Sequence, residues 1–114
     1  MNIVFWNIRG IGNNDSRVAL TDMYRLNNAA LVFIAEPMVV YDSIPNWFWN
    51  NLQVTNFCVN KRDPLIPNLW VVWGTDVSFT VIFASSQCIV LENLCKGTKV
   101  YIAGIYAGTS YILR

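Results

Sequence analysis

The chain has 114 residues, enough for one domain at most, and a formal net charge of +1. Charged residues make up 13% and hydrophobic residues 54%, whereas an average soluble domain is about one quarter charged. No apolar run approaches the ~20 residues that span a bilayer and no secretory leader is visible, so the composition excludes a membrane protein and indicates an intracellular piece of a larger domain.

The first part of the chain is patterned as a strand, a helix and a second strand. Residues 3–6 are a short run of strand formers, followed by a loop rich in glycine and asparagine. Asp15 or Ser16 is placed to cap a helix over residues 18–26, where apolar residues recur at helical spacing. The continuous apolar run of residues 30–35 is typical of a strand buried on both faces. This order predicts a parallel βαβ unit.

The remainder is patterned as short strands separated by turns. Residues 43–52, rich in tryptophan and phenylalanine, predict a short helix. Strand-like runs then recur about every ten residues, which is typical of antiparallel neighbours. They are residues 54–59, 69–73, 79–84, 88–91 and 100–106. Together with the βαβ unit they predict an α/β fold with one mixed sheet and helices on one face.

The inventory of reactive residues narrows the chemistry. The chain has no histidine, which excludes Ser-His-Asp and Cys-His catalysis and histidine metal sites. Cys58, Cys88 and Cys95 form no CxxC pair, so we expect reduced and mostly buried thiols. The basic residues are scattered, and only Lys61 and Arg62 are adjacent, so charge alone gives no support for nucleic-acid binding.

Polar side chains follow three of the predicted strands. Glu36 comes directly after the buried run, Asn7 follows the first strand and Tyr106 follows residues 100–105. A carboxylate at the end of a buried strand destabilises the fold unless a metal, a cation or donors offset its desolvation. Because ligands gather at the carboxyl ends of parallel strands, these side chains predict part of a site for a hard metal ion and a phosphate. The alternative is structural: Glu36 caps a turn, Asn7 bonds loop backbone and Tyr106 packs.

Five stretches of the sequence point to a family when they are taken together. They are residues 6–13 (WNIRGIGN), 17–20 (RVAL), 35–37 (AEP), 68–70 (NLW) and 105–112 (IYAGTSYI), the last with Arg114. In this order, and over the whole length, the chain resembles the N-terminal half of the endonuclease/exonuclease/phosphatase domain of plant LINE-type (non-LTR) retrotransposons. The shared order is more specific than any single stretch.

The resemblance implies a four-layer α/β sandwich of the DNase I type, two mixed sheets with helices outside, with residues 1–114 as its N-terminal half. It also implies a nuclear, magnesium-dependent endonuclease that hydrolyses phosphodiester bonds in DNA. Glu36 would ligate Mg²⁺, Asn7 would orient the metal-binding carboxylates and the phosphate, and Tyr106 would donate to a phosphate oxygen in the transition state. The sequence departs from the family at Pro37, where threonine is usual, and at Gly108, where asparagine or serine is usual.

Later motifs of the family, an Asp-x-Asn, a further aspartate and a terminal Ser-Asp-His, are not in the sequence. One glutamate is a weak Mg²⁺ site, because this ion needs several oxygen ligands or substrate phosphates. We therefore expect a truncated domain without turnover, whose exposed apolar face associates with a missing half or another chain. The alternatives are a non-catalytic protein-interaction module or relic, and an intact small enzyme of unrelated chemistry, which the lack of histidine disfavours.

Overall fold

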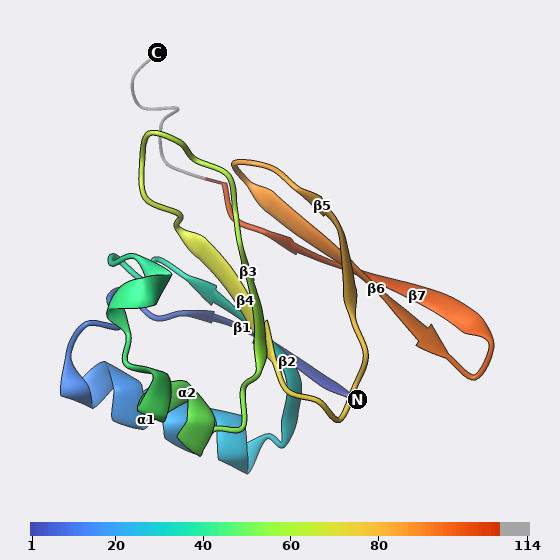
Figure 1. The fold of residues 1–114 in the computed structure, drawn as a ribbon, viewed down its shortest axis with the longest axis horizontal. Helices are drawn as coiled ribbons and strands as arrows, with labels where there is room; N and C mark the ends of the chain where they lie inside the picture. The colour runs from blue at the N-terminus through green and yellow to red at the C-terminus, as the bar shows by residue number, and fades with distance from the viewer. Residues whose placement is uncertain (108–114) are drawn as a thin grey trace.

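Two β-sheets and two α-helices make up residues 1–107, the part of the chain that the computed structural model describes (Figure 1). The first sheet, in the order β1-β2-β4-β3, is built from β1 (Asn2–Asn7), β2 (Ala29–Ala35), β4 (Leu69–Trp73) and β3 (Asn56–Val59). The second, in the order β5-β6-β7, is built from β5 (Thr80–Ala84), β6 (Cys88–Cys95) and β7 (Thr98–Ile105). The predicted α/β class and the two sheets that the resemblance implied are confirmed, whereas the single mixed sheet that the strand pattern predicted is wrong.

The first sheet contains the predicted βαβ unit. β1 and β2 are parallel, with Phe5 opposite Phe33, and β4 pairs antiparallel with both β2 and β3. The helix between β1 and β2 is α1 (Asn14–Leu26), and Asn13 caps it by accepting a bond from the Ser16 N–H at 2.8 Å. The predicted cap at Asp15 or Ser16 is therefore wrong, because the helix begins earlier than its apolar spacing indicated. Asp15 instead lies in the first turn, where a negative charge favours the helix dipole.

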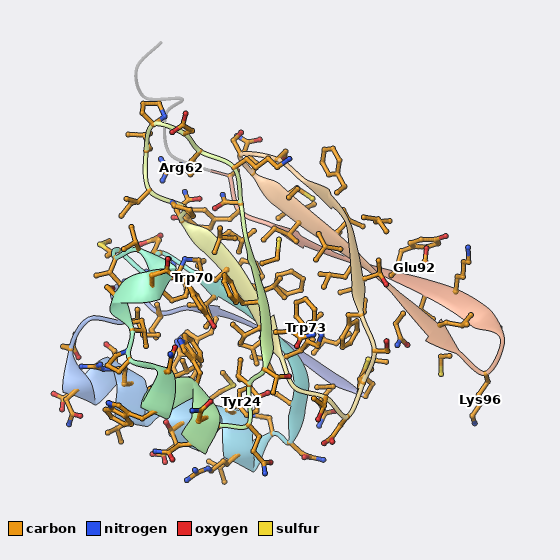
Figure 2. All side chains as sticks on the ribbon, in the orientation of Figure 1. Tyr24, Arg62, Trp70, Trp73, Glu92 and Lys96 are labelled. Carbon is orange, nitrogen blue, oxygen red and sulfur yellow. The ribbon has the colours of Figure 1, made fainter. Side chains whose placement is uncertain are left out.

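Both faces of the first sheet are covered. The helices α1 and α2 (Asn46–Asn51), with a 3₁₀ turn at Tyr41–Ser43, lie on one face, and the second sheet lies on the other (Figure 1). Because successive side chains of a strand point to opposite faces, Val32 and Ile34 pack toward the helices and Leu31 and Phe33 toward the second sheet. Figure 2 shows the same division on β4, with Trp70 on the helix side and Trp73 on the other.

A second sheet forms because β4 has no free edge. Its neighbours are β2 and β3, so β5, the next strand in the chain, cannot pair with it and begins an antiparallel meander. The connection passes close to α2: a Cβ atom at Gly74 would lie 2.6 Å from the backbone oxygen of Gln53. The spacing of the later strands was predicted correctly, but spacing alone does not reveal which edges are already occupied.

The cysteines differ in part from their prediction. All three are free thiols, as expected. Cys58 and Cys88 are half-buried and Cys95 is exposed, so the prediction of mostly buried thiols is wrong. Cys95 ends β6 next to Lys96, which Figure 2 places at the far tip of the β6–β7 hairpin, beyond the part of the sheet that packs on β4.

Large apolar side chains are exposed on the outermost strands. Ile3 and Phe5 on β1 are 43% and 46% exposed, and Ile105 on β7 is 65% exposed. β1 and β7 each lie at one edge of their sheet, so each has an unpaired backbone edge. Within residues 1–107 no helix has the length and apolar character needed to cross a membrane.

Candidate active site

The three side chains singled out in the sequence lie together. Asn7 ends β1, Glu36 follows β2 and Tyr106 follows β7. The Asn7 Nδ2 group donates a hydrogen bond to Glu36 Oε2 at 3.1 Å, and the Tyr106 hydroxyl donates a short one to the same oxygen. The cluster therefore joins the carboxyl ends of two parallel strands of the first sheet to the end of an edge strand of the second.

The Glu36 backbone is held in an uncommon conformation. Its φ is 55°, in the left-handed region that residues with a Cβ atom rarely adopt. Backbone bonds hold it there: the Glu36 N–H donates to Asn68 O at 2.9 Å, and Glu36 O accepts from the Gly10 N–H at 2.7 Å. Arg9, directly before Gly10, also has a left-handed φ of 52°. Such a conformation persists only where surrounding contacts determine it.

Tyr106 is placed by the second sheet. Its N–H donates to the Gln87 carbonyl oxygen at 2.8 Å, which fixes it to the β5–β6 turn. Two residues earlier, Gly104 lies directly on the ring of Phe33, and a Cβ atom at this position would clash with the ring. The absence of a side chain at Gly104 thus lets β7 approach β2 closely enough for the phenol to contact Glu36.

Asn60 is a site-supporting residue that the sequence analysis missed. It is only 2% exposed. Its Oδ1 accepts from the N–H groups of Asn68 and Leu69, both at 3.0 Å, and its Nδ2 donates to Asn68 Oδ1 at 2.7 Å and to Ser86 O at 2.9 Å. Because Asn68 O in turn accepts from Glu36, Asn60 joins the β3–β4 loop, the β5–β6 turn and the candidate site. Its proximity to the NLW stretch was the only indication in the sequence.

Hydrogen bonding dominates the electrostatics of the cluster. The bond from Tyr106, then that from Asn7, lowers the pKa of Glu36, and the charge of Arg9 adds to this, whereas burial opposes it. The bond to Glu36, with desolvation second, raises the pKa of Tyr106. Glu36 is only partly buried, so the sequence argument overestimated its desolvation. At neutral pH the arrangement is a carboxylate with a protonated phenol as its donor.

The donor set fits a hard metal ion only in part. Both side-chain bonds to Glu36 end on Oε2, and the side chain of Asn7 also carries an amide oxygen. These are oxygen donors of the kind Mg²⁺ prefers. Among residues 1–107 no three His, Cys, Asp or Glu side chains are grouped as metal ligands usually are. Glu36 and Asn7 therefore need further oxygen ligands, from substrate phosphate or elsewhere, to hold Mg²⁺.

A cavity of about 650 Å³ lies elsewhere in the molecule, and Asn2, Tyr24, Gln53 and Asp76 are among its lining residues. Asn2 begins the strand that Asn7 ends, so the cavity lies at the opposite end of β1. Burial, then the charge of Asp76, raises the pKa of Tyr24. None of the three candidate site residues lines this cavity. The candidate site is therefore a convergence of side chains outside this cavity.

The two sheets and the helices have the arrangement of a DNase I-like fold. The chain is similar to the solved endonuclease domain of TRAS1, a telomere-specific non-LTR retrotransposon, with a TM-score of 0.62 and 14% sequence identity. The match covers 92% of this chain and 45% of that one, so the chain spans less than half the length of its structural neighbour. No family model and no curated protein matches the sequence.

At this identity the likeness shows the fold, and it confirms the predicted fold class. A plant origin and the roles of Asn7, Glu36 and Tyr106 stay predictions. Gly108 and the rest of the 105–112 stretch beyond residue 107, with Arg114, lie outside the described residues.

Proposed function

We propose that the chain provides part of the active site of a retrotransposon DNA endonuclease that acts in the nucleus. In this proposal Glu36, Asn7 and Tyr106 bind Mg²⁺ and a phosphate of the DNA. The observation that supports this most directly is the convergence of two donors, one from each sheet, on a single oxygen of Glu36. Tyr106 lies 70 positions from Glu36 in the chain, so the fold itself brings the phenol to the carboxylate. The similarity in fold to a retrotransposon endonuclease domain supports the same proposal.

Each side chain has a distinct task in this proposal. Glu36 binds the metal, and Asn7 holds the carboxylate in one orientation through its amide hydrogen bond. When bound, Mg²⁺ polarises a phosphoryl oxygen and offsets the negative charge that develops there. Tyr106, whose pKa is raised by its bond to Glu36, stays protonated at neutral pH. Its hydroxyl can therefore redirect its hydrogen bond from the carboxylate to a phosphate oxygen, where it stabilises the transition state.

We expect binding without hydrolysis from these 114 residues. The sequence has no histidine, and no other carboxylate among residues 1–107 acts on Glu36, so the described part of the chain offers no separate base to activate water. We propose that the remaining ligands and the base come from other protein, as the 45% coverage of the structural neighbour suggests. Supercoiled plasmid incubated with the chain and Mg²⁺ should remain intact. Nicking that Glu36→Gln abolishes would contradict this part of the proposal.

The metal site is tested with Mn²⁺, a paramagnetic ion that prefers the same oxygen ligands. In NMR spectra of the wild-type chain, Mn²⁺ should broaden the amide signals of Asn7, Glu36 and Tyr106 first. Glu36→Gln should remove this selective broadening. The matched control is Glu92→Gln, another partly buried glutamate, which Figure 2 places on the second sheet away from the cluster. If the selective broadening is unchanged in Glu36→Gln, the metal site is refuted.

The apolar strand edges favour a second candidate function, a non-catalytic protein-interaction module. Phe5 and Ile105 are exposed on the two unpaired edges. Residues of this kind are typical of surfaces that other protein covers. A chain that acts only in this way should show no Mn²⁺ effect that depends on Glu36. Its sedimentation coefficient should rise with protein concentration, and replacing both Phe5 and Ile105 with lysine should prevent that rise.

A further inference from the structure

The proposed function leaves unused the only adjacent basic pair of the sequence, Lys61 and Arg62. Both lie in the loop of residues 60–68, between β3 and β4. Figure 1 shows this loop beside the C-terminal end of β7, and Figure 2 places Arg62 on it. The pair therefore lies at the end of the molecule that carries the candidate active site.

Shared anchoring brings Arg62 close to the cluster. The Lys61 N–H donates to Ser85 O at 3.1 Å, and the Tyr106 N–H donates to Gln87 O at 2.8 Å. The β3–β4 loop and Tyr106 are thus both fixed to the same β5–β6 turn. Arg62, the residue directly after Lys61, therefore lies at the same end of the molecule as Tyr106.

The loop is held in place before any ligand arrives. Buried Asn60, the first residue of the loop, is hydrogen-bonded to Asn68, its last residue. Inside the loop the Leu65 N–H donates to Arg62 O at 2.7 Å, and Arg62 Nη1 donates to Ile66 O at 3.0 Å. The Ile66 bond uses one of the five N–H groups of the guanidinium, and others remain for a ligand. Little ordering is needed on binding, which favours affinity.

We propose that Arg62 binds a backbone phosphate of double-stranded DNA next to the phosphate held at Glu36 and Tyr106, with Lys61 adding a weaker, longer-range attraction. The proposal deepens the proposed function, and rests on it for the position of the first phosphate. A planar guanidinium matches two phosphate oxygens at once, which an ammonium group does not. Phosphate contacts fix the position of a duplex without reading its bases. Arg62 is therefore a positioning residue for any DNA sequence.

Binding of a fluorescent duplex of about 20 base pairs, followed by anisotropy from about 50 mM salt upward, tests this. Arg62→Gln should weaken binding roughly 5-fold to 10-fold for every duplex sequence and reduce the slope of log K against log salt by about 0.9. Arg62→Lys should keep the slope and lose part of the affinity. The control Lys96→Gln, which removes a charge at the far hairpin tip, should change affinity less than about 2-fold.

The outcomes separate this proposal from the proposed function. If Arg62→Gln binds DNA as Lys96→Gln does, the Arg62 contact is refuted, while the Mn²⁺ result at Glu36 still decides the metal site. If Arg62→Gln weakens binding but Glu36→Gln leaves the Mn²⁺ broadening intact, the phosphate contact stands and the metal site fails. A wild-type chain that binds no duplex at the lowest salt refutes the Arg62 contact and the DNA-binding part of the proposed function, and the Mn²⁺ result still decides the metal site. Circular dichroism of each variant shows whether it is folded, and Arg62→Lys separates the loss of the guanidinium from the loss of the charge.

Discussion

The two sheets differ in how much of each is covered. The first has helices on one face and the second sheet on the other, and β4 is buried at every residue. The second is covered on its inner face only: on β7, Gly104 is buried against Phe33 while its neighbour Ile105 is 65% exposed. Apolar burial is the main source of stability, so the first sheet with its helices is the stable part of the molecule.

The candidate site depends on both parts. Asn7 and Glu36 belong to the first sheet, whereas Tyr106 is supplied by the second. The carboxylate therefore has a rigid support, and the phenol is only as well placed as the contact between the sheets allows. The comparison teaches that the site is most sensitive to changes at this contact, even where they lie far from Glu36.

The largest expected effect on stability is in the first sheet with its helices. Trp70→Ala should destabilise the chain by about 3–5 kcal/mol, because Trp70 is fully buried among the helices and the first sheet. Tyr101→Ala, at a 58% exposed position on β7, should change stability by less than about 0.5 kcal/mol. Urea unfolding followed by circular dichroism measures both. Equal losses would show that the two sheets do not differ in the way described.

Gly104→Ala tests the contact between the sheets. The added methyl group would meet the Phe33 ring, so we expect a loss of about 1–3 kcal/mol from overpacking and a displacement of β7 that weakens the bond from Tyr106 to Glu36. Ala103→Val adds more volume on the exposed side of the same strand and is the matched control. Stability is read from urea unfolding, and the position of β7 from the NMR shift of Tyr106. A neutral Gly104→Ala would mean that the sheets separate easily.

Asn60→Ala probes the hydrogen-bond network between the same two sheets. It leaves the buried Leu69 N–H without its acceptor, so we expect a loss of about 1–3 kcal/mol. Amide exchange at Leu69 and Glu36 should accelerate, because Asn68 no longer has a fixed partner. Asn50→Ala, at an exposed position of α2, should leave both exchange rates unchanged. If amide exchange is unchanged in Asn60→Ala, Asn60 does not support the candidate site.

The smallest effect concerns pH. Tyr106→Phe removes the main cause of the lowered pKa of Glu36, so this pKa should rise toward its ordinary value of 4.5, as carboxyl carbon NMR can measure. Because the folded-state pKa is the lower one, the contribution to stability is present above pH 4.5 and is lost as the pH falls through the folded-state value. The wild type should therefore exceed Tyr106→Phe in stability at pH 6 and lose that excess in acid. If the wild type remains more stable than Tyr106→Phe in acid, the difference in stability comes from packing.

Local patterns predicted the elements well. The apolar run of residues 30–35 and the helical spacing before it are properties of neighbouring residues, and they gave a βαβ unit that the structure confirms. Pairing between distant strands is not local. Nothing in residues 79–84 shows that β4 is already paired on both edges, and the prediction therefore merged two sheets into one.

The candidate site divides in the same way. Position at a strand end pointed to Asn7, Glu36 and Tyr106, and the resemblance to a family supported all three. The left-handed φ of Glu36 and the network of Asn60 were not predictable, since both are imposed by chain segments distant in sequence. Asparagine and glutamate are common in loops, so their identity alone does not distinguish a supporting residue from a solvated one.

Because both donors bond one oxygen of Glu36, the proposed ligand binding can be followed by thermal unfolding. A metal ion or phosphate held by Glu36 and Tyr106 together is bound only while both sheets are in place, so it binds the folded chain and not the unfolded one. At a concentration about 100 times its dissociation constant, such a ligand raises the free energy of unfolding by about 2.7 kcal/mol. The melting temperature of the chain therefore tests the proposed ligand binding even though we expect no turnover.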